Sequence, residues 1–264
     1  MYKSIFILLL LSSFSFAKVF ITVTYPVERF FIKRIAENTI YIKTIFDEEN
    51  FDTNDISQIK KFSNSNYYFN FNLEDEQKIE AIFKARNNSI KIFHMLEGIP
   101  RVKANDGKAN PYVWLDPLLV RKLAENLYNK LIEIEPESKD IYRVNYESFL
   151  SELDEMFLDI KQRVETSKTF GFFAFSDELY YFAKRFRLNI YHEDAKLLHV
   201  DEVLQLLKFS RKKNIKHLLV PINCDYRIAQ SFCGHIDGKL VEYNLYTYNW
   251  KVNLYSILRG IETN

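Results

Sequence analysis

The stretch ESKDIYRVNYESFLSELDEMFLDIKQRVET, residues 137–166, decides the fold of this 264-residue chain. Its apolar residues recur every three or four positions with charged residues between them, which predicts one continuous amphipathic helix. At 1.5 Å of rise per residue this helix is roughly 45 Å long, which is more than one lobe needs. We therefore predict a rigid linking helix between two lobes. The alternative is a helix that packs on one sheet only.

Short β-rich segments alternate with amphipathic helical segments on both sides of the linking helix. This alternation predicts an α/β fold of two lobes, each with a mainly parallel four-stranded sheet flanked by helices. The N-terminal lobe is expected over residues 18–135, the linking helix over 136–166 and the C-terminal lobe over 167–264. The predicted strands are residues 19–24, 40–46, 67–71, 90–93, 171–175, 189–191, 215–221 and 239–243.

The first 17 residues, MYKSIFILLLLSSFSFA, have the composition of a secretory signal peptide. Their apolar run is shorter than the roughly 20 residues of a membrane-spanning helix. We expect cleavage after Ala17 and a periplasmic location. A disulfide between Cys224 and Cys233 is conceivable in that oxidising setting, but a helix between them would separate the sulfurs too far, which favours free thiols.

Charge and motif content exclude two classes of function. The formal net charge is +1 and the acidic and basic residues are interspersed, so no basic stripe is available for nucleic acid. Ser176 and Asp177 follow a predicted strand, but the Gly-x-Ser-x-Gly pattern and a suitably placed histidine are absent, so we do not expect an enzyme.

Ligands of parallel sheets bind at the carboxyl ends of the strands. This rule selects a set of polar residues in each predicted lobe without reference to any relative. They are Tyr25, Asp47, Glu48, Glu49, Asn72 and His94 in the first lobe, and Ser176, Asp177, His192, Glu193, Asp194, Asn223, Cys224 and Asn244 in the second.

The segment NPYVWLDP, residues 110–117, resembles the Asp-Pro-His-x-Trp-Leu-x-Pro motif of zinc and manganese solute-binding proteins of ABC importers, the metal-binding cluster A-I type. Residues 22–26, the long helix from Pro136, and residues 175–182 are also similar to that family, in the same order. The resemblance implies a two-lobed monomer that works with an ABC permease in the inner membrane. It also implies a divalent ion, zinc or manganese, as the transported ligand.

The same resemblance implies four ligand positions, and this sequence has changed them. Tyr112 stands where the family has a histidine, Ser176 where it has histidine or glutamate, and Asn244 where it has aspartate. The fourth position falls at Glu49, or alternatively at Asp47. Phenol, hydroxyl and amide oxygens are poor zinc ligands, so we predict weak zinc binding or none.

A replacement metal site is also conceivable. His192 and Asp194 belong to a cluster of metal-binding side chain types at a predicted strand end, and with Glu49 they would bridge the lobes. The alternative for this cluster is a solvated turn. His94 is expected to line the cleft or to pack beneath it.

The leading interpretation is therefore a periplasmic solute-binding protein of a metal-ion ABC importer, divergent in its ligand. That ligand would be an ion, a metal complex or a small organic solute. The alternative is a scaffold or interaction protein that kept the fold and lost metal binding.

Overall fold

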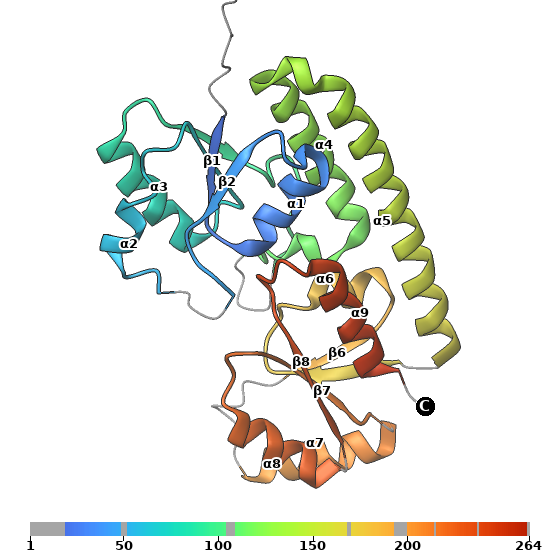
Figure 1. The fold of residues 1–264 in the computed structure, drawn as a ribbon. Coiled ribbons are helices and arrows are strands. Elements are labelled where there is room, and N and C mark those ends of the chain that lie inside the picture. The colour runs from blue at the N-terminus through green and yellow to red at the C-terminus, as the bar shows by residue number, and fades with distance from the viewer. Residues whose placement is uncertain are drawn as a thin grey trace, which may run out of the picture.

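The computed structural model describes residues 19–48, 52–103, 109–167, 170–192, 200–213, 215–236 and 238–262. It has two lobes side by side with one long helix, α5, along both of them (Figure 1). The predicted signal peptide, residues 1–17, lies outside the described residues. None of the helices in the described ranges has the length and apolar character to cross a membrane.

Each lobe contains a sheet of four parallel strands. The first has the order β2-β1-β3-β4 and the second the order β6-β5-β7-β8, so the two sheets share one winding pattern. This confirms the predicted fold class and all eight predicted strands. Their bounds are β1 Phe20–Val23, β2 Tyr41–Thr44, β3 Tyr67–Asn70, β4 Lys91–His94, β5 Gly171–Ala174, β6 Asn189–His192, β7 His217–Pro221 and β8 Lys239–Tyr243.

Helices cross over between the parallel strands, as such sheets require. Pro26 and Pro117 occupy first-turn positions of their helices, where the missing N–H has no helical partner to lose. The helices are α1 Pro26–Ala36, α2 Ile56–Lys60, α3 Glu74–Arg86, α4 Pro117–Ile134, α5 Lys139–Ser167, α6 Tyr180–Arg185, α7 Val200–Lys213, α8 Tyr226–Ile236 and α9 Trp250–Ile261, with 3-10 turns at Val113–Leu115 and Pro136–Ser138.

Helix α5 is the predicted linking helix. It packs on α1 and α4 in the first lobe and on α9 in the second. Near one end, Asn145 donates to the carbonyl of Ile35 at 3.0 Å. Nearer the other end, Arg163 forms a bidentate ion pair with Glu262, with both N–O distances at 2.7 Å. The helix is therefore fixed to both lobes by specific contacts, and the prediction of a rigid link is confirmed.

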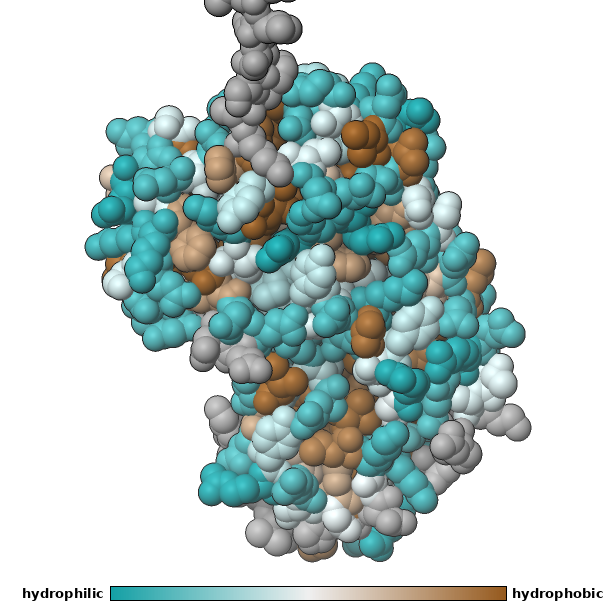
Figure 2. Space-filling model, viewed as in Figure 1, coloured by the Kyte–Doolittle hydropathy of each residue, from teal (hydrophilic) through white to brown (hydrophobic). Residues whose placement is uncertain are grey.

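The lobes share a core. One cluster of buried apolar side chains continues from the first sheet through α4 and α5 to α9, while a smaller cluster lies between the second sheet and α7 and α8. Trp250 of α9 contacts Phe31 of α1 with ring centroids 5.2 Å apart. The face shown in Figure 2 is mainly hydrophilic, with apolar residues in small separate groups. The shared core sets the relative position of the two sheets.

Cys224 and Cys233 are both free thiols, which agrees with the prediction that they do not form a disulfide. Most of α8 lies between them. Burial raises the pKa of the Cys233 thiol to about 11, so this thiol stays protonated at neutral pH.

Candidate functional site: a cleft between the lobes

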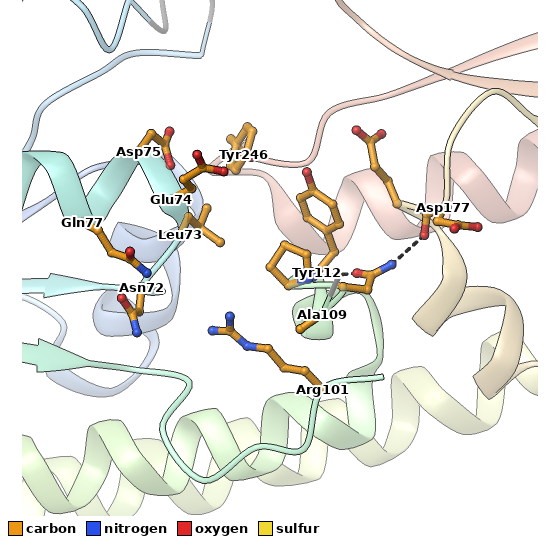
Figure 3. Close-up of a pocket in the computed structure, with 13 residues that line it drawn as sticks. Asn72, Leu73, Glu74, Asp75, Gln77, Arg101, Ala109, Tyr112, Asp177 and Tyr246 are labelled. Carbon is orange, nitrogen blue, oxygen red and sulfur yellow. Dashed lines mark hydrogen bonds between the residues drawn. The ribbon is translucent and has the colours of Figure 1, made fainter. Parts of the chain in front are cut away.

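A cavity of about 550 Å³ opens between the lobes at the carboxyl ends of the strands (Figure 3). One side comes from the segment that joins β3 to α3, and the opposite side from the turn after β5 and the loop after β8. The segment before α4 forms the wall between them. The lining residues are Asn72, Leu73, Glu74, Asp75, Gln77, Arg101, Ala109, Asn110, Pro111, Tyr112, Asp177, Glu178 and Tyr246.

The wall between the lobes is held by Asn110, whose side chain donates to the carbonyl of Asp177 at 2.8 Å. The main-chain carbonyl of Asn110 accepts from the hydroxyl of Tyr181 at 3.1 Å, and the same hydroxyl accepts from the amide of Val102 at 2.9 Å. Asn110, at the start of this segment, is therefore tied to the second lobe by its side chain and its main chain, and Tyr112 follows two residues later.

Three tyrosines connect the two sides of the cleft. Tyr25, at the end of β1, stacks on Tyr246 of the second lobe with ring centroids 4.1 Å apart and donates its hydroxyl to Asp75. Tyr246 is also hydrogen-bonded to Tyr112. Tyr112 in turn packs edge-to-face on Trp114, with centroids 5.4 Å apart. The phenol groups thus form a continuous row from Asp75 to the centre of the cavity.

Glu178 is one of two acidic residues that line the cavity on the second-lobe side, with Asp177. It accepts the hydroxyl of Tyr243 at 2.6 Å and is also hydrogen-bonded by Ser176. Burial raises the pKa of Glu178, and these two hydrogen bonds oppose the shift. A cation in the cleft would favour the ionised carboxylate further, so Glu178 is suited to bind positive charge.

The tyrosine hydroxyls stay neutral at physiological pH. Burial, followed by the negative charge of Glu178, raises the pKa of Tyr112 to about 12. The pKa of Tyr246 is raised further, first by burial and then by the hydrogen-bonded phenol of Tyr112 and the charge of Asp75. These groups therefore act as hydrogen-bond donors and neutral oxygen ligands rather than as phenolates.

Two buried glutamates fix the floor beneath the first-lobe side. Glu28 accepts the amides of Thr24 at 2.7 Å and Tyr25 at 2.9 Å, and the amide of Phe71 lies 3.0 Å from both carboxyls. Burial and the neighbouring carboxyl raise the pKa of Glu28, and burial also raises the pKa of Glu76. The pair joins the N-terminus of α1 to the segment before α3, and Asp75 lies in the first turn of α3.

The structure places the predicted site residues in different surroundings. Tyr112 lines the cleft, and Ser176 lies behind Glu178, 3.5 Å from the hydroxyl of Tyr243. Asn244 accepts the amide of Tyr246 at 2.9 Å, so its side chain closes a turn that presents Tyr246.

Asn72 and Asp177, which were also selected at strand ends, line the cavity as well. The other predicted ligand residues are not placed there by the described part of the chain. His94 contacts Glu80 at 3.0 Å and does not line the cleft. Only the backbone of His192 is described, at the end of β6. Glu49 and Asp194 lie outside the described residues.

Sequence reasoning missed five lining residues that carry charge or a phenol: Glu74, Asp75, Arg101, Glu178 and Tyr246. Asp75 and Glu178 lie just beyond the strand ends that had been singled out, at Asn72 and Ser176. In the described part of the chain, no three His, Cys, Asp or Glu side chains come together as a metal-binding group.

Comparison with known proteins identifies the fold family. The family described as zinc-uptake complex component A, periplasmic, matches residues 21–248. The high-affinity zinc uptake system protein ZnuA of Yersinia pestis is 28% identical over 83 residues, which is 31% of this chain and 26% of that protein. The matched part thus spans about a quarter of that relative.

Solved structures share nearly the whole fold. A crystal structure of ZnuA superposes with a TM-score of 0.83 at 22% identity, covering 93% of this chain and 98% of that one. A manganese-bound variant of the periplasmic metal binding protein of Candidatus Liberibacter asiaticus has a TM-score of 0.76 at 16% identity, covering 92% and 100%. The two lobes, the linking helix and the match over residues 21–248 together show that this chain belongs to the family of periplasmic zinc-uptake complex component A.

Proposed function

We propose that this chain is the periplasmic solute-binding component of an ABC importer of the zinc and manganese type, with a changed ligand site. The observation that carries the proposal is that both lobes contribute to one cavity at the carboxyl ends of their sheets. Such a cavity is suited to hold a solute for delivery to a permease, and no chemical step is needed. No described feature favours the alternative of a scaffold without a ligand.

The donor set of the cleft supports a cation-bearing solute. Asp75 and Glu178 offer carboxylates from the two lobes, and Tyr112 and Tyr246 offer neutral oxygens between them. Oxygen donors of this kind suit manganese, magnesium or calcium better than zinc. Of the two ions that the family resemblance implies, zinc and manganese, these oxygen donors favour manganese as the transported ion.

The other predicted features belong to the same proposal. The chain is exported, cut after Ala17, and acts as a monomer with an inner-membrane permease, with lobes at residues 18–135 and 167–264 joined by 136–166. Ser176 supports Glu178 and Asn244 supports Tyr246, while ligand roles for Glu49, His94, His192 and Asp194 stay predictions.

Calorimetry of the chelator-stripped mature chain against Zn²⁺, Mn²⁺ and Ca²⁺ tests the proposal. Replacing Asp75 with Asn or Glu178 with Gln is expected to weaken binding of the preferred ion at least about tenfold, since each removes a charged ligand. Asp225→Asn, at an exposed carboxylate that pairs with Arg227, is the matched control and should bind like the parent. Binding that neither cleft variant alters would place the site elsewhere.

A further inference from the structure

Among the described residues that line the cleft, Arg101 is the one cationic residue, against the acidic residues Glu74, Asp75, Asp177 and Glu178. Its guanidinium extends from the loop after β4 toward the α3 side of the cavity (Figure 3). There it donates to the carbonyl of Phe71 at 2.8 Å. A fixed positive charge in a cavity meant for a bare cation would weaken binding, so the residue needs another explanation.

The guanidinium keeps donors for a ligand. A guanidinium has five N–H groups, and the bond to Phe71 uses one of them. No carboxylate of the described residues lies within ion-pair distance of Arg101. Burial lowers the pKa of Arg101, and the neighbouring Tyr181 and Glu76 side chains oppose the shift. The guanidinium of Arg101 remains charged, and it is placed to form a bidentate ion pair with the carboxylate of a ligand.

The size of the cavity also indicates a ligand larger than a bare ion. A bare ion with a few waters occupies little space, because each water takes about 30 Å³. The cleft has about 550 Å³, which is in the range of pockets for small organic molecules. Its lining carries one guanidinium, that of Arg101, together with carboxylates at Asp75 and Glu178, which matches a solute with a negative group and a positive centre.

We propose that the solute carries a carboxylate that pairs with Arg101, while its positive centre, an amine or a chelated divalent ion, faces Asp75 and Glu178. The ligand class is thus a small amino carboxylate, either free or as its metal chelate. This inference rests on the proposed function of the cleft and narrows its solute.

The test compares Zn²⁺ alone, Mn²⁺ alone, L-histidine alone, and each ion with excess L-histidine, by calorimetry on the mature chain. The parent is expected to bind histidine or its metal complex about tenfold or more tightly than the bare ion, since a half-buried charge pair contributes at that level. Binding of free histidine would identify the amino acid as the source, and binding of the complex alone would identify the chelate.

Arg101→Gln is expected to remove the preference for the carboxylate ligand while leaving affinity for the bare ion equal or higher. Arg101→Lys should recover part of the preference for the carboxylate ligand, because lysine keeps the positive charge but cannot donate two parallel hydrogen bonds as the guanidinium does. Arg259→Gln, at an exposed arginine of α9, is the control. Melting temperatures of all variants show whether a loss reflects unfolding.

Two results would overturn the inference. Equal affinity for the bare ion and for the histidine complex, in both parent and Arg101→Gln, would exclude the carboxylate contact while leaving a cation-binding function intact. Binding of neither the ions nor histidine in any form would remove the proposed function as well.

Discussion

Trp250 donates its indole N–H to the main-chain carbonyl of Trp114 at 2.8 Å, and Trp114 donates its own indole N–H to the carbonyl of Leu245 at 3.0 Å. Both indoles are buried. The segment before α4 is thereby tied to the last loop and last helix of the second lobe. The same segment carries Tyr112 and the loop carries Tyr246, so this pair of bonds fixes the two phenols that meet in the cleft.

Trp250→Phe is expected to lower the free energy of unfolding by about 1–3 kcal/mol, because it removes the donor to a buried carbonyl and part of the packing. Urea denaturation measures the change. Tyr41→Phe, at a tyrosine that is 46% exposed on β2, should change stability by less than about 0.5 kcal/mol. An equally small effect of Trp250→Phe would show that the indole bond does not stabilise the junction.

Asp116 and Arg185 form a second junction. The carboxylate of Asp116 caps α4 through the amide of Leu118 at 2.9 Å and receives the guanidinium of Arg185 at 2.7 Å. Its side chain is 5% exposed, so the pair is screened little by solvent.

Asp116→Asn keeps an oxygen for the cap but loses the charge, and a loss of about 1–3 kcal/mol is expected from urea denaturation. Asp116→Ala should lose about 1 kcal/mol more, since it also removes the cap. Glu133→Gln, at an exposed carboxylate that pairs with Lys130, is the control with little expected effect. Equal stabilities of the Asn and Ala variants would mean that the cap contributes nothing.

The fold was predictable because its signals are local and repeated. The alternating strands and the apolar spacing of α5 needed no knowledge of contacts, and Asp116 with Pro117 marked the start of α4. The site was harder, because only the backbone path decides which turn residue faces the cleft. Asn244 was selected at a strand end, yet its side chain closes the turn and Tyr246 enters the cavity.

The missed carboxylates have a related explanation. Asp75 and Glu178 lie a few residues past the strand ends, at or near the starts of α3 and α6, where neighbouring acids Glu74 and Asp177 are equally suitable by sequence. Their hydroxyl partners, Tyr25 and Tyr243, come from other strands. No sequence spacing links residues so far apart in the chain.

The buried pair Glu28 and Glu76 predicts a pH dependence of stability. Since the folded state raises both pKa values above the ordinary 4.5, the folded chain keeps protons that the unfolded chain releases above that pH. Stability from this pair is therefore full below about pH 4.5 and falls as pH rises through the raised values. The two carboxyls are hydrogen-bonded to each other, so one of them holds a proton. Both oxygens of Glu28 accept main-chain N–H groups, whereas Oε1 of Glu76 accepts none among the described residues, which favours Glu76 as the protonated partner.

Glu76→Gln should flatten the fall in unfolding free energy above about pH 4.5, because the neutral amide replaces the protonated carboxyl. Glu28→Gln should destabilise instead, by about 1–3 kcal/mol, since both oxygens of Glu28 accept main-chain N–H groups. Denaturation at several pH values measures both. An unaltered slope in Glu76→Gln would show that the pair is ionised throughout.

Tyr112→His tests whether the phenol at this position accounts for the weak zinc binding that we predict. The phenol of Tyr112 stays protonated, with a pKa raised to about 12 by burial and by Glu178, and it is a poor zinc ligand in that form. A neutral imidazole near Glu178 would offer zinc a nitrogen and a carboxylate from the two lobes. Zinc affinity measured by calorimetry is therefore expected to rise at least about tenfold.

Tyr41→His, which adds an imidazole on exposed β2 away from the cleft, should leave zinc affinity unchanged. Mn²⁺ should gain less than Zn²⁺ in Tyr112→His, because manganese prefers oxygen donors. If zinc and manganese affinity rise equally in Tyr112→His, or if Tyr41→His raises zinc affinity as much as Tyr112→His does, the added imidazole binds metal without the other residues of the cleft. No rise at all would mean that Asp75 and Glu178 lie too far from this position to complete a zinc site. The geometry of the cleft, and not only its side chains, would then be unsuited to zinc.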